Sequence, residues 1–258
     1  MEAIGSMSKD IVFLVCFEQP NRGKSYKYSV RSWQDWSKHN GASVVILDNP
    51  IVPIDKIRPN WQKYFILDLL QKESVEFDHI LIADADTVVH PDCPNLFDIA
   101  GDKYSAVLNY GSLAWVYHSI ELYNRMAFQE CGIQLHHYDY VNTGIQIFHY
   151  THKDFIKGIL QFVQDNYDIL SGMQLKYKLG TEQTPVNYLR KLYGVELNVL
   201  DYKFNMQDLC RKEILGDDML FTKLGWVYHF NAIPQGMGTA DYWVEKTYKY
   251  LYGGGQNS

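Results

Sequence analysis

The first half of the chain alternates short apolar runs with segments of helical periodicity. Short, mostly apolar runs, which predict strands covered on both faces, occupy residues 11–17, 43–47 and 78–83. Between them, residues 24–39 and 61–72 space their apolar side chains as a helix does, and Gly41 follows the first of these helices in the position of a C-terminal glycine. This order predicts a parallel sheet with right-handed crossovers and a ligand crevice at the carboxyl ends of its strands.

The second half is more mixed, with shorter strands and longer helical segments. Strands are predicted at residues 104–108, 145–148, 195–200 and 226–230, and helices at 120–130, 154–166, 182–192 and 241–252. There is no internal repeat and no low-complexity linker between the halves. The sequence therefore predicts one α/β domain over residues 10–252, with a mostly parallel central sheet flanked by helices, a flexible leader at 1–9 and a flexible tail at 253–258.

Composition and charge narrow the class of protein. Of 258 residues, 47% are apolar and 21% are charged, which is typical of a globular protein, and a net charge of −6 argues against a nucleic-acid binder. The four cysteines, with no metal-binding or disulfide-framework spacing, indicate a reducing compartment. Neither a signal peptide before Asp10 nor an apolar run of about 20 residues is present, so we expect a cytoplasmic protein without a membrane span.

The chemistry of the chain is concentrated where the third predicted strand ends, at Asp84-Ala85-Asp86. Desolvating two carboxylates without a partner costs several kcal/mol, and a divalent cation is a suitable partner because hard cations bind oxygen ligands. The alternative is a turn with two solvated aspartates. The position of the pair at the carboxyl edge of a parallel sheet favours a site for a metal and a diphosphate.

A metal bound by two carboxylates needs further ligands, and His229 is the best candidate in the chain. It ends a second apolar strand, in Tyr228-His229-Phe230-Asn231. An imidazole beside two carboxylates favours Mn²⁺ somewhat over Mg²⁺. The alternative for a single histidine is a hydrogen-bonded residue at the rim of the fold.

Several segments along the chain form an ordered set of motifs. The first are Pro-Asn-Trp-Gln-Lys-Tyr at 59–64 and the strand and Asp pair at 77–87. Three more follow, Val-Asn-Thr-Gly at 141–144, Glu-Gln-Thr-Pro-Val-Asn at 182–187 and Tyr-His-Phe-Asn at 228–231. Together these segments, which span nearly the whole chain, resemble GT-A-fold glycosyltransferases, in particular the glycogenin-like and galactosyl/xylosyltransferase families, and they occur in the order those families show. The resemblance implies a Rossmann-like GT-A domain that transfers a sugar from a nucleotide diphosphate donor, by default a UDP-sugar, to a hydroxyl of a glycan or another acceptor.

The resemblance also implies roles for individual residues. Asp84 would contact both the ribose of the donor and the metal, and Asp86 and His229 would complete the metal ligands, with Mn²⁺ or Mg²⁺ as the cofactor. Lys63 would support the nucleotide or the diphosphate. For Lys63 the alternative is a solvated helical lysine.

The remaining implied roles concern the sugar. Asn142, with Thr143 and Gly144 of the same motif, would line the sugar pocket, and Glu182 and Gln183 would lie on the reacting face of the sugar as catalytic residues. The alternatives are an ordinary turn for 142–144 and a helix-capping or solvated carboxylate for Glu182. Because the glycogenin-like families retain the anomeric configuration, we expect retention. The segment at 136–140, rich in histidine and tyrosine, is either an acceptor contact or an exposed loop.

The chain departs from the family pattern after His229. Asn231-Ala232 stands where those families have a glycine, and no Lys-Pro-Trp follows, so the resemblance does not imply a contact between this loop and the diphosphate. The alternative donors for that contact are the backbone N–H groups of residues 235–238, which include two glycines.

Three other functions remain as alternatives. A phosphatase of the haloacid-dehalogenase type needs Asp-x-Asp-x-Thr after its first strand, but here Thr87 follows Asp86 directly and the pair ends the third strand. A nucleotide-sugar pyrophosphorylase needs a glycine-rich basic loop after the first strand, and Asn-Arg-Gly-Lys at 21–24 is only weakly similar to such a loop. A non-catalytic nucleotide-sugar-binding module would not need the full set of Asp pair, histidine and Glu-Gln.

Overall fold

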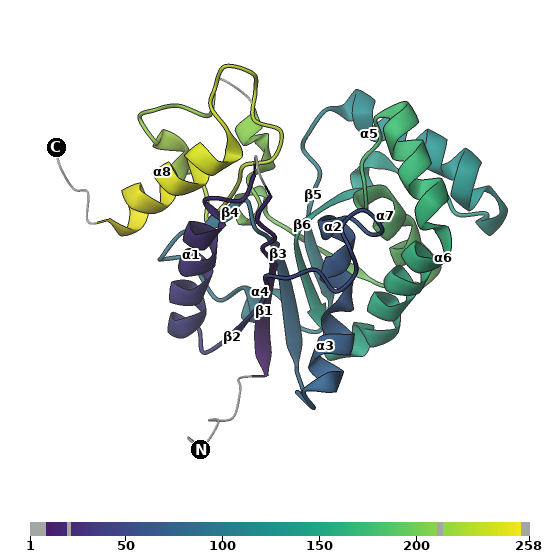
Figure 1. Ribbon diagram of the computed structural model, residues 1–258, viewed down its shortest axis with the longest axis horizontal. Helices are drawn as coiled ribbons and strands as arrows, with labels where there is room; N and C mark the ends of the chain where they lie inside the picture. The colour runs from purple at the N-terminus through teal and green to yellow at the C-terminus, as the bar shows by residue number, and fades with distance from the viewer. Residues whose placement is uncertain (1–8, 20–21, 211–213, 254–258) are drawn as a thin grey trace.

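The computed structural model describes residues 9–19, 22–210 and 214–253, so most of the predicted leader and tail lies outside the described residues. A six-stranded sheet forms the centre and helices cover both of its faces (Figure 1). Its strands, in spatial order, are β2 (Ser43–Leu47), β1 (Asp10–Val15), β3 (His79–Asp84), β6 (Val141–His149), β5 (Tyr104–Leu108) and β7 (Leu197–Leu200). The predicted α/β class is therefore confirmed.

The sheet is mostly parallel, with one exception that matters for the site. The pairs β1–β2, β1–β3 and β5–β7 are parallel, whereas β6 runs antiparallel to both of its neighbours. Ala83, near the end of β3, pairs with Ile145, in the middle of β6, so the residues of β6 before Ile145 extend beyond this pair. Because of this reversed direction, the first residues of β6 lie at the edge where β3 ends.

The apolar runs in β1 and β3 are buried on both faces, as the sequence predicts. The prediction of a buried strand at 43–47 is wrong, because β2 lies at the edge of the sheet, is only partly buried and exposes Ile46. In β1, Ile11 and Phe13 face one core, while Val12 and Leu14 face the other. One face is covered by α2 (Pro59–Gln62), α3 (Ile66–Lys72), α5 (Leu113–Tyr123), α6 (Lys153–Tyr177) and α7 (Gln183–Leu192). The other is covered by α1 (Tyr26–His39) and α4 (Leu96–Ala100).

A smaller unit lies beside α1 at the carboxyl end of the sheet (Figure 1). It consists of a two-stranded antiparallel ladder, β4 (Thr87–Val89) with β8 (Val227–His229), and the terminal helix α8 (Ala240–Tyr252). Val88, Tyr228 and Trp243 belong to its apolar core. The sequence analysis did not predict β4, because three residues are too short for a periodic signal.

Three predicted helices differ from the observed ones. The helix predicted at 61–72 is interrupted by a 3₁₀ turn, Lys63–Phe65, that separates α2 from α3. The helix predicted at 120–130 begins earlier, where the Ser112 side chain caps the N–H of Trp115, and changes after Tyr123 to π and 3₁₀ turns. The amphipathic helix predicted at 154–166 continues to Tyr177, because Leu170 and Met173 keep one face buried.

Candidate active site and metal centre

The Asp pair lies in the tight connection between β3 and β4. Asp84 is the last residue of β3, and Asp86 stands in the turn before Thr87. The hydroxyl of Thr87 donates to the carbonyl oxygen of Asp84 (2.7 Å) and accepts from the indole N–H of Trp33 (3.0 Å), which fixes the turn. Asp86 is only 4% exposed, so the alternative of a turn with two solvated aspartates is wrong.

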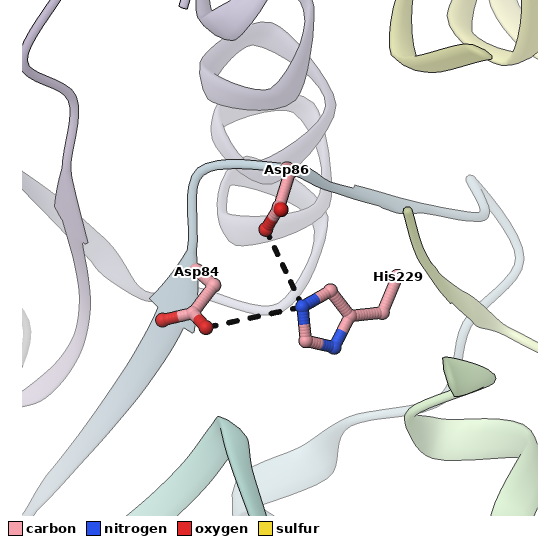
Figure 2. Close-up of side chains that lie close together, drawn as sticks. All are labelled: Asp84, Asp86 and His229. Atoms are coloured by element: carbon pink, nitrogen blue, oxygen red, sulfur yellow. Dashed lines mark ion pairs between the residues drawn. The ribbon is translucent and has the colours of Figure 1, made fainter. Parts of the chain in front are cut away.

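The β4–β8 ladder brings His229 to the Asp pair. Thr87 pairs directly with His229, and the N–H of Phe230 donates to the carbonyl oxygen of Asp86 (2.9 Å). The Nε2 atom of His229 consequently lies 3.3 Å from Asp86 Oδ1 and 3.8 Å from Asp84 Oδ2 (Figure 2). His229 is buried among these groups, so the alternative of a rim histidine is also wrong.

These three side chains fit a divalent cation. One ligand atom from each lies within 4.8 Å of the others, and neighbouring ligands of an octahedral ion with bonds of about 2.1 Å stand about 3 Å apart. Burial alone would lower the pKa of His229, but Asp86 and Asp84 outweigh burial and the pKa is raised overall. Burial would raise the pKa of Asp86, but His229 and Arg22 hold it below its usual range. At Asp84 burial outweighs Lys63 and His229, and its pKa is raised. Asp86 is therefore the member of the cluster that most stabilises a positive charge where a cation would bind.

Lys63 is buried between two carboxylates, so its alternative role as a solvated helical residue is wrong. The 3₁₀ turn after α2 points its Nζ atom at Asp84 Oδ1 (2.9 Å), Glu182 Oε1 (3.0 Å) and the carbonyl oxygen of Thr143 (2.9 Å). All three ammonium protons therefore have acceptors. Burial would lower the pKa of Lys63, but Asp84 and Glu182 raise it above its usual range, and the side chain stays charged.

Glu182 is buried and accepts four hydrogen bonds. Its Oε1 atom accepts from Lys63 and from the hydroxyl of Thr143 (2.9 Å), and its Oε2 atom accepts from Asn60 and Thr181, both at 2.5 Å. Burial would raise the pKa of Glu182, but Lys63 and the other donors outweigh it and hold the pKa at about 2. A carboxylate with every lone pair engaged is a poor base and a poor nucleophile, and the solvated alternative is wrong.

The Asn-Thr-Gly segment begins β6 beside this network and is not an ordinary surface turn. Asn142 and Thr143 are buried, and the N–H of Gly144 donates to the side-chain oxygen of Asn142 (2.9 Å). A Cβ atom on Gly144 would lie 2.2 Å from Cε1 of His229. The glycine therefore makes room for the imidazole ring, a requirement that the sequence does not reveal.

Two residues that contact the candidate metal ligands were missed by the sequence analysis. Arg22 donates to Asp86 Oδ2 (2.7 Å). Its only signal in the sequence was the weak similarity of Asn-Arg-Gly-Lys at 21–24 to the glycine-rich basic loop of a pyrophosphorylase. Asn205 is fully buried, and its Oδ1 atom lies 3.0 Å from Nδ1 of His229. Nothing in the sequence around Asn205 marks it, because it lies outside every predicted element.

A cavity of about 560 Å³ opens over these side chains, a volume within the usual range for a small-molecule site. All nine residues predicted for the site line it: Lys63, Asp84, Asp86, Asn142, Thr143, Gly144, Glu182, Gln183 and His229. Arg22, Arg58 and Trp115 line it as well. The structure thus collects the predicted residues from five separate parts of the chain in one pocket.

The loop after His229 reaches the cavity with Asn231 only. Ala232, at the position of the family's glycine, has a φ of +48°, the left-handed conformation that favours glycine. Within the part of the chain that the structure describes, residues 235–238 do not line the cavity. The segment at 136–140 also lies outside the lining, and Tyr138 is exposed.

No protein-family profile and no curated protein sequence matches this chain. Several solved structures, however, are similar to this chain. A glycosyltransferase involved in the glycosylation of the major capsid of PBCV-1 is 12% identical, with a TM-score of 0.55 over 91% of this chain and 98% of that protein. This chain has a glycosyltransferase fold.

Two further structures support the same fold. The glycosyltransferase GlyE of Streptococcus pneumoniae TIGR4 is 13% identical, with a TM-score of 0.53 over 93% of this chain and 60% of GlyE. The bifunctional glycosyltransferase WbbM is 12% identical, with a TM-score of 0.52 over 89% of this chain and 46% of WbbM. Among the helices described, none combines the length and the apolar character needed to cross a bilayer.

Proposed function

We propose that this protein is a metal-dependent glycosyltransferase that moves a sugar from a nucleotide diphosphate donor to an acceptor hydroxyl. The observation that carries the proposal is the cluster of Asp84, Asp86 and His229 at the carboxyl edge of β3, inside a glycosyltransferase fold. A UDP-sugar is the default donor, from the family resemblance, and the acceptor is a glycan or another hydroxyl compound.

The proposed cofactor is Mn²⁺ or Mg²⁺, held by Asp84, Asp86 and His229. A bound divalent cation would supply Lewis-acid stabilisation of the leaving diphosphate. Arg22, which stands beside Asp86 with a half-exposed side chain, adds a second positive charge at the same end of the cavity. These side chains together would bind and orient the diphosphate.

The sugar is proposed to lie against the opposite part of the cavity. Asn142, Thr143 and Gly144 would line its pocket, and Gln183 would present its amide to the reacting face. Glu182, with four donors around it, serves best as the group that holds Lys63 in place. Lys63 in turn orients Asp84, which would contact the ribose and the metal.

The set of carboxylates supports retention of the anomeric configuration. Among the described residues that line the cavity, the acids are Asp84, Asp86 and Glu182. The first two are proposed metal ligands, and Glu182 has no lone pair to spare, so none is free to deprotonate an acceptor as an inverting base must. A front-side route avoids this need. The bond from the anomeric carbon to the phosphate oxygen breaks, the acceptor oxygen bonds to that carbon from the same face, and its proton passes to the leaving phosphate.

The test is a nucleotide diphosphate sugar panel with and without Mn²⁺, read first by thermal shift and then by release of the nucleoside diphosphate. The right donor should raise the melting temperature only with metal, since a ligand stabilises the state it binds. EDTA or Asp86→Asn should remove nearly all turnover, whereas Asp92→Asn, at an exposed carboxylate outside the cavity, should not. The anomeric configuration of the product, read by NMR, tests retention.

Three results would contradict the proposal. Full turnover by Asp86→Asn or by EDTA-treated protein would exclude the metal role. Donor binding without hydrolysis or transfer would favour the non-catalytic module. Formation of a nucleoside triphosphate and a sugar 1-phosphate from the donor and pyrophosphate would identify a pyrophosphorylase.

A further inference from the structure

A chain of amide side chains, which we call the amide chain, connects the candidate metal centre to the sugar end of the cavity. It starts at His229 and passes through Asn205, Asn142 and Gln183 to Asn109. The four hydrogen bonds along it measure 3.0, 2.9, 3.1 and 3.2 Å in that order. Asn205 is fully buried, and Asn142 and Gln183 are only 4% and 8% exposed, so water competes little for their donors and acceptors.

The direction of these hydrogen bonds is fixed by the backbone. The N–H of Gly144 can only donate, and its partner in the Asn142 side chain (2.9 Å) must therefore be the carbonyl oxygen. That same oxygen faces the Asn205 side chain, which must turn its NH₂ group toward it. The carbonyl oxygen of Asn205 is thereby turned toward His229, where it requires a donor.

We propose that Asn205 is the positioning residue that fixes His229 in its Nδ1–H tautomer and leaves Nε2 to bind a divalent cation. The imidazole donates Nδ1–H to Asn205, and its Nε2 atom faces Asp84 and Asp86. Metal-binding histidines generally donate their other ring N–H to an oxygen acceptor, which fixes both tautomer and ring orientation. The inference rests on the proposed metal site and adds the group that prepares it.

The other branch of the amide chain orients the sugar end. Asn142 has its oxygen engaged by Gly144 and Asn205, so its NH₂ group donates to the carbonyl oxygen of Gln183. The NH₂ group of Gln183 then donates to Asn109. One backbone N–H thus sets the orientation of the metal-binding imidazole and of the amide that faces the sugar, without a charged group between them.

The experiment reads the tautomer directly, in the metal-free full-length protein labelled with ¹⁵N-histidine. Spectra are recorded at a pH high enough to leave His229 neutral, with assignment by His229→Gln. The wild-type protein should show Nδ1–H and a bare Nε2. Asn205→Leu, which removes the acceptor, should shift the population toward Nε2–H, whereas Asn205→Asp, which keeps an acceptor, should retain Nδ1–H.

Mn²⁺ binding, followed by electron paramagnetic resonance, is the second readout. Asn205→Leu should weaken the affinity about 10–100-fold, the usual effect of losing a partner of a metal-binding histidine. The matched control is Asn198→Leu, because Asn198 donates to Ser105 (3.0 Å) on the far edge of the sheet and does not contact the site. Its Mn²⁺ affinity should equal that of the wild-type protein.

An Nε2–H tautomer in the wild-type protein would overturn the inference, and this measurement holds even where a variant fails to fold. Unchanged tautomer and unchanged Mn²⁺ affinity in Asn205→Leu would overturn it as well. The tautomer is read without metal and without donor. Mn²⁺ binding without sugar transfer would therefore refute the proposed function while these readouts still decide the role of Asn205.

Discussion

Replacement of Lys63 by methionine tests the buried ion cluster that supports the site. The substitution keeps the length of the side chain and removes a charge that donates to Asp84, Glu182 and Thr143 at 2.9–3.0 Å. Removing one partner of a buried ion pair costs about 3–5 kcal/mol, because the remaining charge is left without compensation. Since Lys63 serves two carboxylates, we expect a loss at the upper end of this range in the free energy of unfolding at neutral pH.

The pH dependence of this loss has a definite sign. In the wild-type protein the pKa of Glu182 is held at about 2, below its unfolded value of about 4.3, so its contribution is present above that value and lost as the pH falls toward 2. Without Lys63, the folded pKa of Glu182 should rise, because burial is then opposed only by the hydrogen bonds from Thr181, Asn60 and Thr143. As the pH falls, protonation of Glu182 removes the unpaired buried charge from the Lys63→Met variant. The difference between the two proteins should therefore shrink as the pH falls from neutral toward about 2.

The assay is urea unfolding in EDTA, followed by tryptophan fluorescence, with a double variant as a second arm. Lys63→Met combined with Glu182→Gln should recover part of the lost stability, because one of the two unpaired charges is gone. Lys103→Met is the control, since Lys103 forms an exposed pair with Glu196 and should show no measurable loss. A loss below about 1 kcal/mol in Lys63→Met, or no recovery in the double variant, would refute the reasoning.

Three further predictions concern the surroundings of the metal centre. Gly144→Ala should weaken Mn²⁺ binding about 10–100-fold, because the added Cβ would displace His229. Gly172→Ala is the control, since a Cβ there would have no atom within 4 Å. Equal Mn²⁺ affinities of the two variants in a titration would contradict the prediction. Ala232→Gly should raise the free energy of unfolding by about 1 kcal/mol in urea, since it relieves a left-handed φ of +48°; a loss would show that the strain is not there. Arg22→Gln should weaken nucleoside diphosphate binding about tenfold and reduce its salt dependence in calorimetry without weakening Mn²⁺ alone, and an unchanged diphosphate affinity would exclude Arg22 from that contact.

The sequence was sufficient for the first half of the sheet and for the Asp pair. Strands β1 and β3 consist mostly of apolar residues, a pattern typical of strands that are covered on both faces. The same pattern located β2, although this edge strand is only partly buried. Once β3 is placed, chain direction alone puts Asp84 and Asp86 at the carboxyl edge. This part of the prediction depends on local pattern and on the handedness of crossovers, and both can be read from one sequence.

The antiparallel direction of β6 could not be predicted in the same way. A buried apolar strand has the same pattern in either direction, and direction depends on how the long segment before Val141 crosses the sheet. The family resemblance supplied the residues of this strand but not their orientation. The sequence therefore predicted that Asn142 belongs to the site without giving the reason that it reaches Asp84.

The partners of the site residues were the least predictable part. Lys63 reads as a helical lysine, and its burial depends on a 3₁₀ turn and on two carboxylates far along the chain. Asn205 and Arg22 act through hydrogen bonds to residues far away in the sequence, and such contacts leave no periodic pattern. Short polar contacts between distant segments are specified by the completed fold, so pattern analysis finds the ligands of a site more readily than the groups that hold them.

The last part of the chain completes the site, and this has a consequence for the order of assembly during synthesis. The β4–β8 ladder brings His229 to the Asp pair, and Asp241, in the first turn of α8, accepts hydrogen bonds from the backbone N–H groups of Gly23 and Ser25, the latter 216 positions away. Most of the sheet can form on the ribosome before His229 has emerged, and until then the two aspartates have no histidine opposite them. A nascent chain would therefore lack the complete cation site until this late segment docks, which ties the onset of metal binding to the completion of folding.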